Sequence, residues 1–129
     1  MLRVTSLAAL AFIAAAPLST AAAVSRNKSV PAGRATMLDA YSGWNNDCSF
    51  LVIKVNITAP PAHGKISTRI GHGFIREANE GSVGSCLGKP TRVLQLWYTP
   101  KRGYHGSDTV SVLAGAGNPT TYYYSITVE

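Results

Sequence analysis

The alternation of apolar and polar residues is clearest in the last ten residues of the chain. From Thr120 to Glu129 one side of the segment carries four large apolar or aromatic residues, which are Tyr122, Tyr124, Ile126 and Val128. A period of two is typical of a half-buried β-strand, whose successive side chains point to opposite faces. Residues 48–58 alternate in the same way, with Leu51, Ile53, Val55 and Ile57 on one face. We predict a strand over each segment.

Three more segments are predicted as strands, at residues 65–75, 91–99 and 108–113. They are bounded by turn-forming residues, because proline lacks a backbone donor and glycine permits tight turns. The mature chain shows no convincing helical period, although residues 34–41 are ambiguous. Short strands separated by Gly/Pro turns predict an all-β protein, and we expect one antiparallel β-sandwich domain over residues 33–129.

The N-terminus has the layout of a secretory signal peptide. A positive charge at Arg3 precedes a short apolar stretch over residues 7–17, and small residues follow at 19–23. This pattern predicts cleavage after Ala23. An uncleaved membrane anchor is the alternative, but the apolar stretch falls short of the roughly 20 residues that a bilayer requires. We expect a secreted or periplasmic protein with no membrane span after cleavage, and a flexible mature N-terminus over residues 24–32.

The predicted domain is basic. Of the 12 Lys and Arg residues only Arg3 leaves with the signal peptide, and all 6 Asp and Glu residues remain, so the net charge falls from +6 to +5. A basic exported domain favours anionic partners, such as an anionic envelope polysaccharide, or another exported protein. The charge can equally serve solubility alone. Nucleic acid is not an expected partner, because export separates the protein from it. The sequence does not predict an oligomeric state.

Two cysteines remain in the mature chain, Cys48 and Cys86. Because exported proteins meet an oxidising compartment, we predict a disulfide between them. Closing a loop of about 38 residues stabilises a chain by roughly 4 kcal/mol in the chain-entropy model. A metal site is the alternative use of the thiols, but it requires further ligands at suitable spacing.

Two short motifs resemble a known pattern. Pro-Ala-His-Gly-Lys-Ile at 61–66 and Trp-Tyr-Thr-Pro-Lys-Arg-Gly-Tyr-His-Gly-Ser-Asp-Thr-Val at 97–110 resemble the signature of bacterial immunoglobulin-like or cadherin-like domains. The resemblance implies an Ig-like β-sandwich without catalytic machinery, and it implies no particular ligand. This chain has one such module rather than an array, and it carries a long cysteine-containing insertion between the two motifs.

The second motif is interpreted as a structural corner formed by Pro100, Gly103, Gly106 and Asp108. We expect positive φ angles at the two glycines, and we expect Asp108 to accept hydrogen bonds from nearby turn amides. A calcium site at Asp108 is the alternative, although no second acidic residue lies nearby in the sequence.

The sequence shows no catalytic constellation. His63, His72 and His105 lack the spacing of metal ligands, no serine lies in a G-x-S-x-G motif, and no pair of carboxylates suggests glycosidase chemistry. We therefore expect no enzyme activity, no metal and no cofactor. Aromatic and basic side chains could instead form a binding face, for which the candidates are Trp97, Lys101, Arg102 and Tyr123, with Tyr41 and Trp44 as further aromatic residues.

The sequence as a whole predicts a non-catalytic exported module that binds a partner or is an accessory protein associated with the cell envelope. Two alternatives remain open. One is a secreted inhibitor or effector that acts through the cysteine loop Glu77–Pro90, and the other is a small periplasmic metal-binding protein.

Overall fold

A computed structural model describes residues 14–17, 22–76 and 86–129. Most of the predicted signal peptide and most of the loop Glu77–Pro90 therefore lie outside the described residues, and the predictions made for them stay predictions. Within the described ranges, no helix is both long and apolar enough to cross a membrane.

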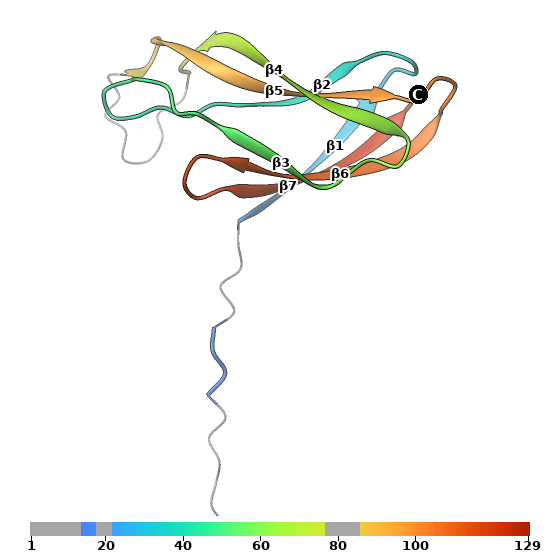
Figure 1. Ribbon diagram of the computed structural model, residues 1–129, viewed down its shortest axis with the longest axis horizontal. Coiled ribbons are helices and arrows are strands. Elements are labelled where there is room, and N and C mark those ends of the chain that lie inside the picture. The colour runs from blue at the N-terminus through green and yellow to red at the C-terminus, as the bar shows by residue number, and fades with distance from the viewer. Residues whose placement is uncertain (1–13, 18–21, 77–85) are drawn as a thin grey trace, which may run out of the picture.

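In the described part of the chain, seven strands form two sheets that pack face to face as a β-sandwich, as the sequence predicts (Figure 1). The four-stranded sheet has the order β1 (Ala23–Val30), β7 (Thr120–Val128), β6 (Gly106–Gly115) and β3 (Lys54–Ala59). The three-stranded sheet has the order β2 (Thr36–Tyr41), β5 (Pro90–Pro100) and β4 (Gly64–Phe74).

The core lies between the sheets and follows the predicted alternation. On β7 the inward residues Tyr124, Ile126 and Val128 are buried, and on β5 Leu96 and Tyr98 have no exposed surface. The remaining core residues are contributed by the other strands and are Val30, Leu38, Tyr41, Val110, Val112 and Ala114. Burying side chains of this size stabilises a fold by about 1.5–3 kcal/mol each.

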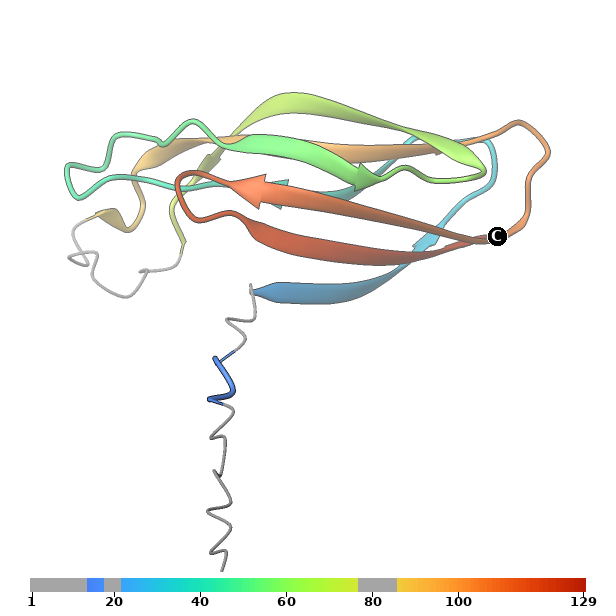
Figure 2. The ribbon, with the colours of Figure 1, turned by 60° about the horizontal axis from the view of Figure 1, so that its bottom comes forward.

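The expectation of a flexible segment over residues 24–32 is wrong for most of its length. Ala23–Val30 forms β1, which pairs in parallel with β7, whereas every other strand pair of the described chain is antiparallel (Figure 2). The backbone of Glu129 also donates to Val30, and that of Ala32 donates to Glu129. The partners of β1 come from the far end of the chain, so the polar sequence of this segment gives no sign of its pairing.

The strand predicted over residues 48–58 is shorter than expected. β3 begins at Lys54, and Leu51 instead donates its backbone N–H to the carbonyl of Gly43. The ambiguous segment at 34–41 contains β2, with a bulge between Met37 and Asp39 where its register against β5 shifts. The bulge places both Leu38 and Asp39 toward the interior, because an extra residue reverses the alternation of faces.

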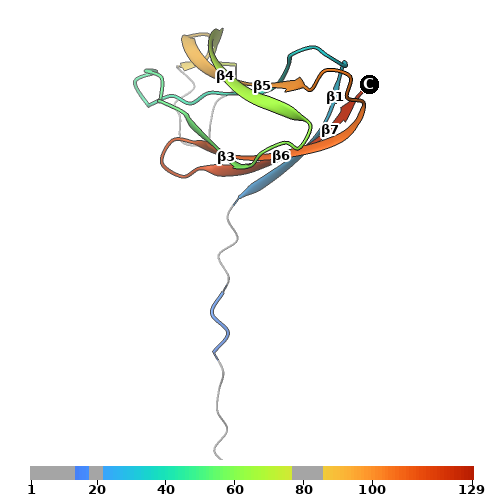
Figure 3. The same cartoon turned by 45° about the vertical axis from the view of Figure 1, so that its right-hand side comes forward.

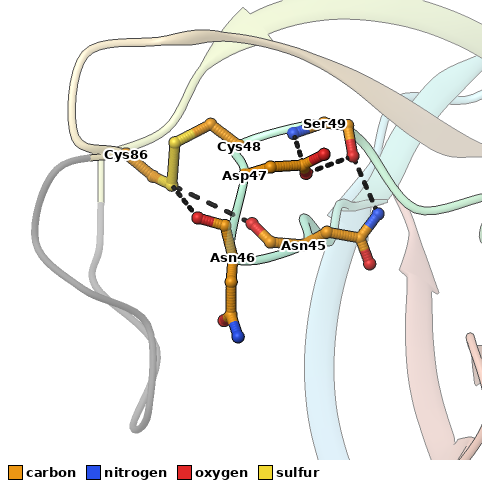
Figure 4. Close-up of a disulfide and its surroundings, with 6 residues drawn as sticks. All are labelled: Asn45, Asn46, Asp47, Cys48, Ser49 and Cys86. Carbon is orange, nitrogen blue, oxygen red and sulfur yellow. Dashed lines mark hydrogen bonds between the residues drawn. A yellow bond between two sulfur atoms is a disulfide. The ribbon is translucent and has the colours of Figure 1, made fainter.

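The predicted disulfide between Cys48 and Cys86 is present, with the two Cα atoms 5.3 Å apart (Figure 4). It joins the turn before β3 to the segment before β5. Within that turn Asn45 donates to the Ser49 hydroxyl, and the hydroxyl and backbone N–H of Ser49 donate to Asp47. A disulfide is compatible with an extracellular or periplasmic location.

Candidate functional site

The predicted corner is a network of hydrogen bonds centred on Asp108. Its carboxylate accepts from the backbone N–H groups of Ala62, His63 and Thr109, each at 2.9 Å, and from the hydroxyl of Tyr98 at 2.8 Å. Asp108 is only 6% exposed. The turn amides expected as its donors are therefore present, together with a tyrosine hydroxyl that the sequence did not indicate.

These hydrogen bonds set the protonation of the corner. Burial alone would raise the pKa of Asp108, but the four hydrogen bonds outweigh burial and hold its pKa below the usual range. Burial and the hydrogen bond to Asp108 raise the pKa of Tyr98. Asp108 is therefore ionised and Tyr98 is protonated at neutral pH.

The glycines of the corner have the expected backbone. Gly103 has φ of 79° and Gly106 has φ of 130°, both in the region that disfavours L side chains. Pro100 ends β5. His63 stacks on the ring of Tyr104 with 4.0 Å between the centroids. Each carboxylate oxygen of Asp108 accepts two hydrogen bonds from protein groups, so we interpret the corner as structural.

The residues predicted to form one binding face are not brought together. Trp97 alternates with the buried Leu96 and Tyr98, so it lies on the outer face of the three-stranded sheet. Tyr123 lies on the outer face of the four-stranded sheet, on the opposite side of the sandwich. Lys101 and Arg102 are exposed in the turn after β5. Arg69 also covers one face of Trp97, at 4.1 Å from the ring centroid. The predicted platform therefore does not form.

Edge strand β3 faces edge strand β4 across the sandwich (Figure 3), and apolar side chains are exposed on these two strands and on the segment before β3. We call this surface the apolar seam and define it by four residues whose side chains are unusually exposed for their type: Phe50, Val52, Ile57 and Ile70. Val52 is 73% exposed and Ile70 is 69% exposed. A shallow groove of about 100 Å³ lies along it, between Phe50, Val52 and Ile70.

The end of the sandwich away from the Asp108 corner holds a polar cavity of about 540 Å³. It is lined by the turn after β2, the β6–β7 turn and residues of β1 and β7. Two charged residues line it among those that the structure describes, Arg26 and Asp39, and they form an ion pair at 3.0 Å.

A tyrosine pair joins this ion pair to the core. The hydroxyl of Tyr124 donates to Asp39 at 2.8 Å and is also hydrogen bonded to the hydroxyl of Tyr41. Burial raises the pKa of Tyr124, and its bonds to Tyr41 and Asp39 raise it further. Burial also raises the pKa of Tyr41. The network connects β1, β2 and β7, and therefore both sheets.

Sequence reasoning missed the cavity. Asp39 lies in the segment whose structure was ambiguous, and Arg26 lies in the segment expected to be flexible. Tyr122 and Tyr124 were expected in the core, and Tyr124 is buried there. Nothing in the local sequence pattern could have placed the arginine beside the aspartate.

The histidines lie in separate elements, with His63 and His105 in turns and His72 on β4. In the described part of the chain, no group of three or more His, Cys, Asp or Glu side chains is arranged to hold a metal ion. The cysteine loop proposed for an inhibitor lies largely outside the described residues.

Comparisons with known proteins place the chain in no family. No family model matches the sequence, and no curated protein matches it. Among solved structures the chain is similar to the solution structure of amebosin, at 9% identity, with 85% of this chain and 99% of that chain covered and a TM-score of 0.43. The resemblance to bacterial immunoglobulin-like or cadherin-like domains stays a prediction.

Proposed function

We propose that this protein is an exported, non-catalytic β-sandwich module that binds another exported protein through the apolar seam and the free edge of β4. The observation that carries this proposal is the exposure of Phe50, Val52, Ile57 and Ile70 along one side of the molecule. Contiguous exposed apolar side chains are typical of interaction sites. The signal-peptide pattern and the disulfide support export.

The edge of β4 offers the complementary hydrogen-bonding groups. β4 has eleven residues, and within the described chain it pairs on one side only, with β5. An unpaired strand edge is a template for an extended segment of another chain, which adds as a further strand. β4 is longer than the other edge strands, β1, β2 and β3.

The side chains of β4 indicate what that segment would contain. Ile66 packs against the core and Ile70 belongs to the seam, whereas Lys65 and Arg69 alternate with them on the outer face and are exposed. A strand added beside β4 would place every second side chain against the apolar seam and the others beside the two cations. The partner is therefore an extended segment in which apolar and acidic residues alternate.

The test uses a labelled synthetic peptide of about nine residues in which valine and glutamate alternate. Fluorescence anisotropy should show saturable binding to the mature protein. A peptide of the same composition with its valines grouped together, and one with lysine in place of glutamate, should bind more weakly because they lack the alternating faces or the charge.

Two variants locate the surface. Ile70→Ser and Lys65→Glu should each weaken binding of the alternating peptide by about fivefold or more. The matched controls are Met37→Ser, an exposed apolar residue on the opposite edge strand of the same sheet, and Lys101→Glu, an exposed cation away from β4. Neither control should change the affinity.

The proposal is wrong if none of the three peptides binds, or if all bind equally. It is also wrong if the protein dimerises in sedimentation equilibrium and Ile70→Ser abolishes the dimer, because the occupant of the seam would then be a second copy of this chain.

A further inference from the structure

The polar cavity at the end of the sandwich has the size of a ligand site. Its volume of about 540 Å³ lies within the range of small-molecule pockets, which runs from about 300 to 1,000 Å³. It opens between the two sheets, where the turn after β2 faces the β6–β7 turn. The apolar seam and this cavity share only the wall formed by Leu51 and Ile53.

The charges of the cavity cancel. The guanidinium of Arg26 and the carboxylate of Asp39 are paired at 3.0 Å, and Asp39 also accepts the hydroxyl of Tyr124. Drawing Arg26 onto an anionic ligand would take the cation partner from the Asp39 carboxylate, whose side chain is only 18% exposed, and leaving a largely buried charge without its partner is costly. The cavity therefore favours a ligand without net charge.

The rest of the lining combines aromatic rings with neutral polar groups. Trp44 and Tyr122 contribute rings, and the Tyr122 ring lies 5.0 Å from the buried core ring of Tyr41, at an angle of 57°. Ser42, Asn118 and Thr120 contribute hydroxyl and amide groups. A ligand that matches this lining has apolar ring faces and a rim of neutral hydrogen-bonding groups.

We infer that the cavity binds a neutral sugar unit, such as the end of a neutral oligosaccharide. A pyranose ring presents C–H groups on its faces and hydroxyl groups around its rim, so it matches aromatic rings with interspersed polar side chains. This differs from the anionic polysaccharide that net charge alone suggested, because the net charge of the whole chain does not describe the cavity.

The chain offers a fluorescent reporter for this site. It contains two tryptophans, Trp44 in the cavity lining and Trp97 on the outer face of the three-stranded sheet. In Trp97→Phe all tryptophan emission comes from Trp44. This variant is titrated with maltose, cellobiose, lactose and N,N′-diacetylchitobiose, and with digalacturonic acid as the charged comparison.

At least one neutral sugar should shift the emission of Trp44 saturably, with a Kd of about 1 mM or tighter. Asn118→Ala and Tyr122→Phe, each in the Trp97→Phe background, should weaken that binding by about fivefold or more. The matched control is Tyr123→Phe, which removes the neighbouring hydroxyl from the opposite, outward face.

Binding is also measured by calorimetry on the wild-type protein, and thermal melting verifies that each variant is folded. The inference is overturned if no neutral sugar binds, if digalacturonic acid binds more tightly than all of them, or if Asn118→Ala and Tyr122→Phe bind as the control does. Asn118 and Tyr122 line the cavity and not the groove along the seam, and the residues changed in the peptide experiment do not line the cavity, so either proposal can fail without the other.

Discussion

At the scale of single residues, Asp108 connects parts of the chain that are far apart in sequence. It lies on β6 of one sheet, yet it accepts hydrogen bonds from Tyr98 on β5 of the other sheet and from Ala62 and His63 between β3 and β4. Three backbone donors and one hydroxyl leave a buried carboxylate fully partnered, which is the condition for burying a charge at low cost.

Replacing this carboxylate should change how stability depends on pH. Because the folded protein holds the pKa of Asp108 below its usual range, its contribution is complete above the unfolded pKa of about 3.9 and is lost as the pH falls through the folded pKa. Asp108→Asn should cost about 2 kcal/mol at pH 7. It should also flatten the loss of stability below about pH 4, as measured by urea unfolding from pH 2 to 7.

The same variant also tests whether Asp108 binds calcium. If the corner is structural, melting temperatures in calcium and in chelator should agree for the wild type and for Asp108→Asn. A wild-type melting temperature that drops in chelator, with no drop in the variant, would make Asp108 a cation ligand.

A close approach at the corner gives a second prediction. A Cβ added to Gly64 would lie 2.4 Å from Cε2 of Tyr98 and 2.7 Å from the backbone oxygen of Thr99, whereas one added to Gly73 on the same strand would meet nothing closer than 3.7 Å. Gly64→Ala should therefore destabilise the protein by about 1–3 kcal/mol, with Gly73→Ala close to wild type in thermal melting. Equal melting temperatures of the two variants would contradict this account.

At the scale of elements, the parallel strand β1 is the one that sequence patterns missed. Its backbone pairs with β7 along its whole length, and its last residue, Val30, is fully buried. Its Arg26 forms an ion pair with Asp39 on β2. The predicted cleavage after Ala23 would leave almost all of this strand on the mature protein.

Two truncated chains test the role of β1. A chain that begins at Val24 should fold, whereas one that begins at Pro31 loses the ladder with β7, the Val30 side chain and the Arg26–Asp39 pair. We expect the shorter chain to be less stable by at least about 2 kcal/mol in urea unfolding. Equal stability of the two chains would show that β1 is dispensable. Intact-mass analysis of the exported protein gives the position of cleavage.

At the scale of the whole molecule, the two sides of the sandwich differ in chemistry. Edge strands β3 and β4 leave apolar side chains exposed, whereas edge strands β1 and β2 are connected by an ion pair beside a polar cavity. The disulfide fixes the turn before β3 to the segment before β5, at the end of the sandwich that holds the cavity. The two proposed sites are therefore neighbours with different chemistry, and they share the wall formed by Leu51 and Ile53.

The sequence by itself determined the fold class, the disulfide and the corner. Strands such as β7 and β5 bury one face, so their apolar residues recur with a period of two. The two cysteines of the mature chain allow only one pairing with each other. The two glycines of the corner take positive φ angles within their own turn, and Asp108 accepts from Thr109, its neighbour in sequence. Local chemistry is sufficient for these features, whereas the donors on Ala62, His63 and Tyr98 reach Asp108 only through the fold.

Tertiary structure alone decided the sites. Arg26 meets Asp39 because β1 pairs with the last strand and because a bulge in β2 turns Asp39 inward, and neither event leaves a local pattern. Trp97 and Tyr123 separate because they belong to different sheets, although both are aromatic residues on outward positions. Phe50 and Val52 of the seam lie outside β3, because that strand begins at Lys54, later than its alternation predicts. Each of these outcomes depends on which strands become neighbours, and the packing of the whole chain determines those neighbours.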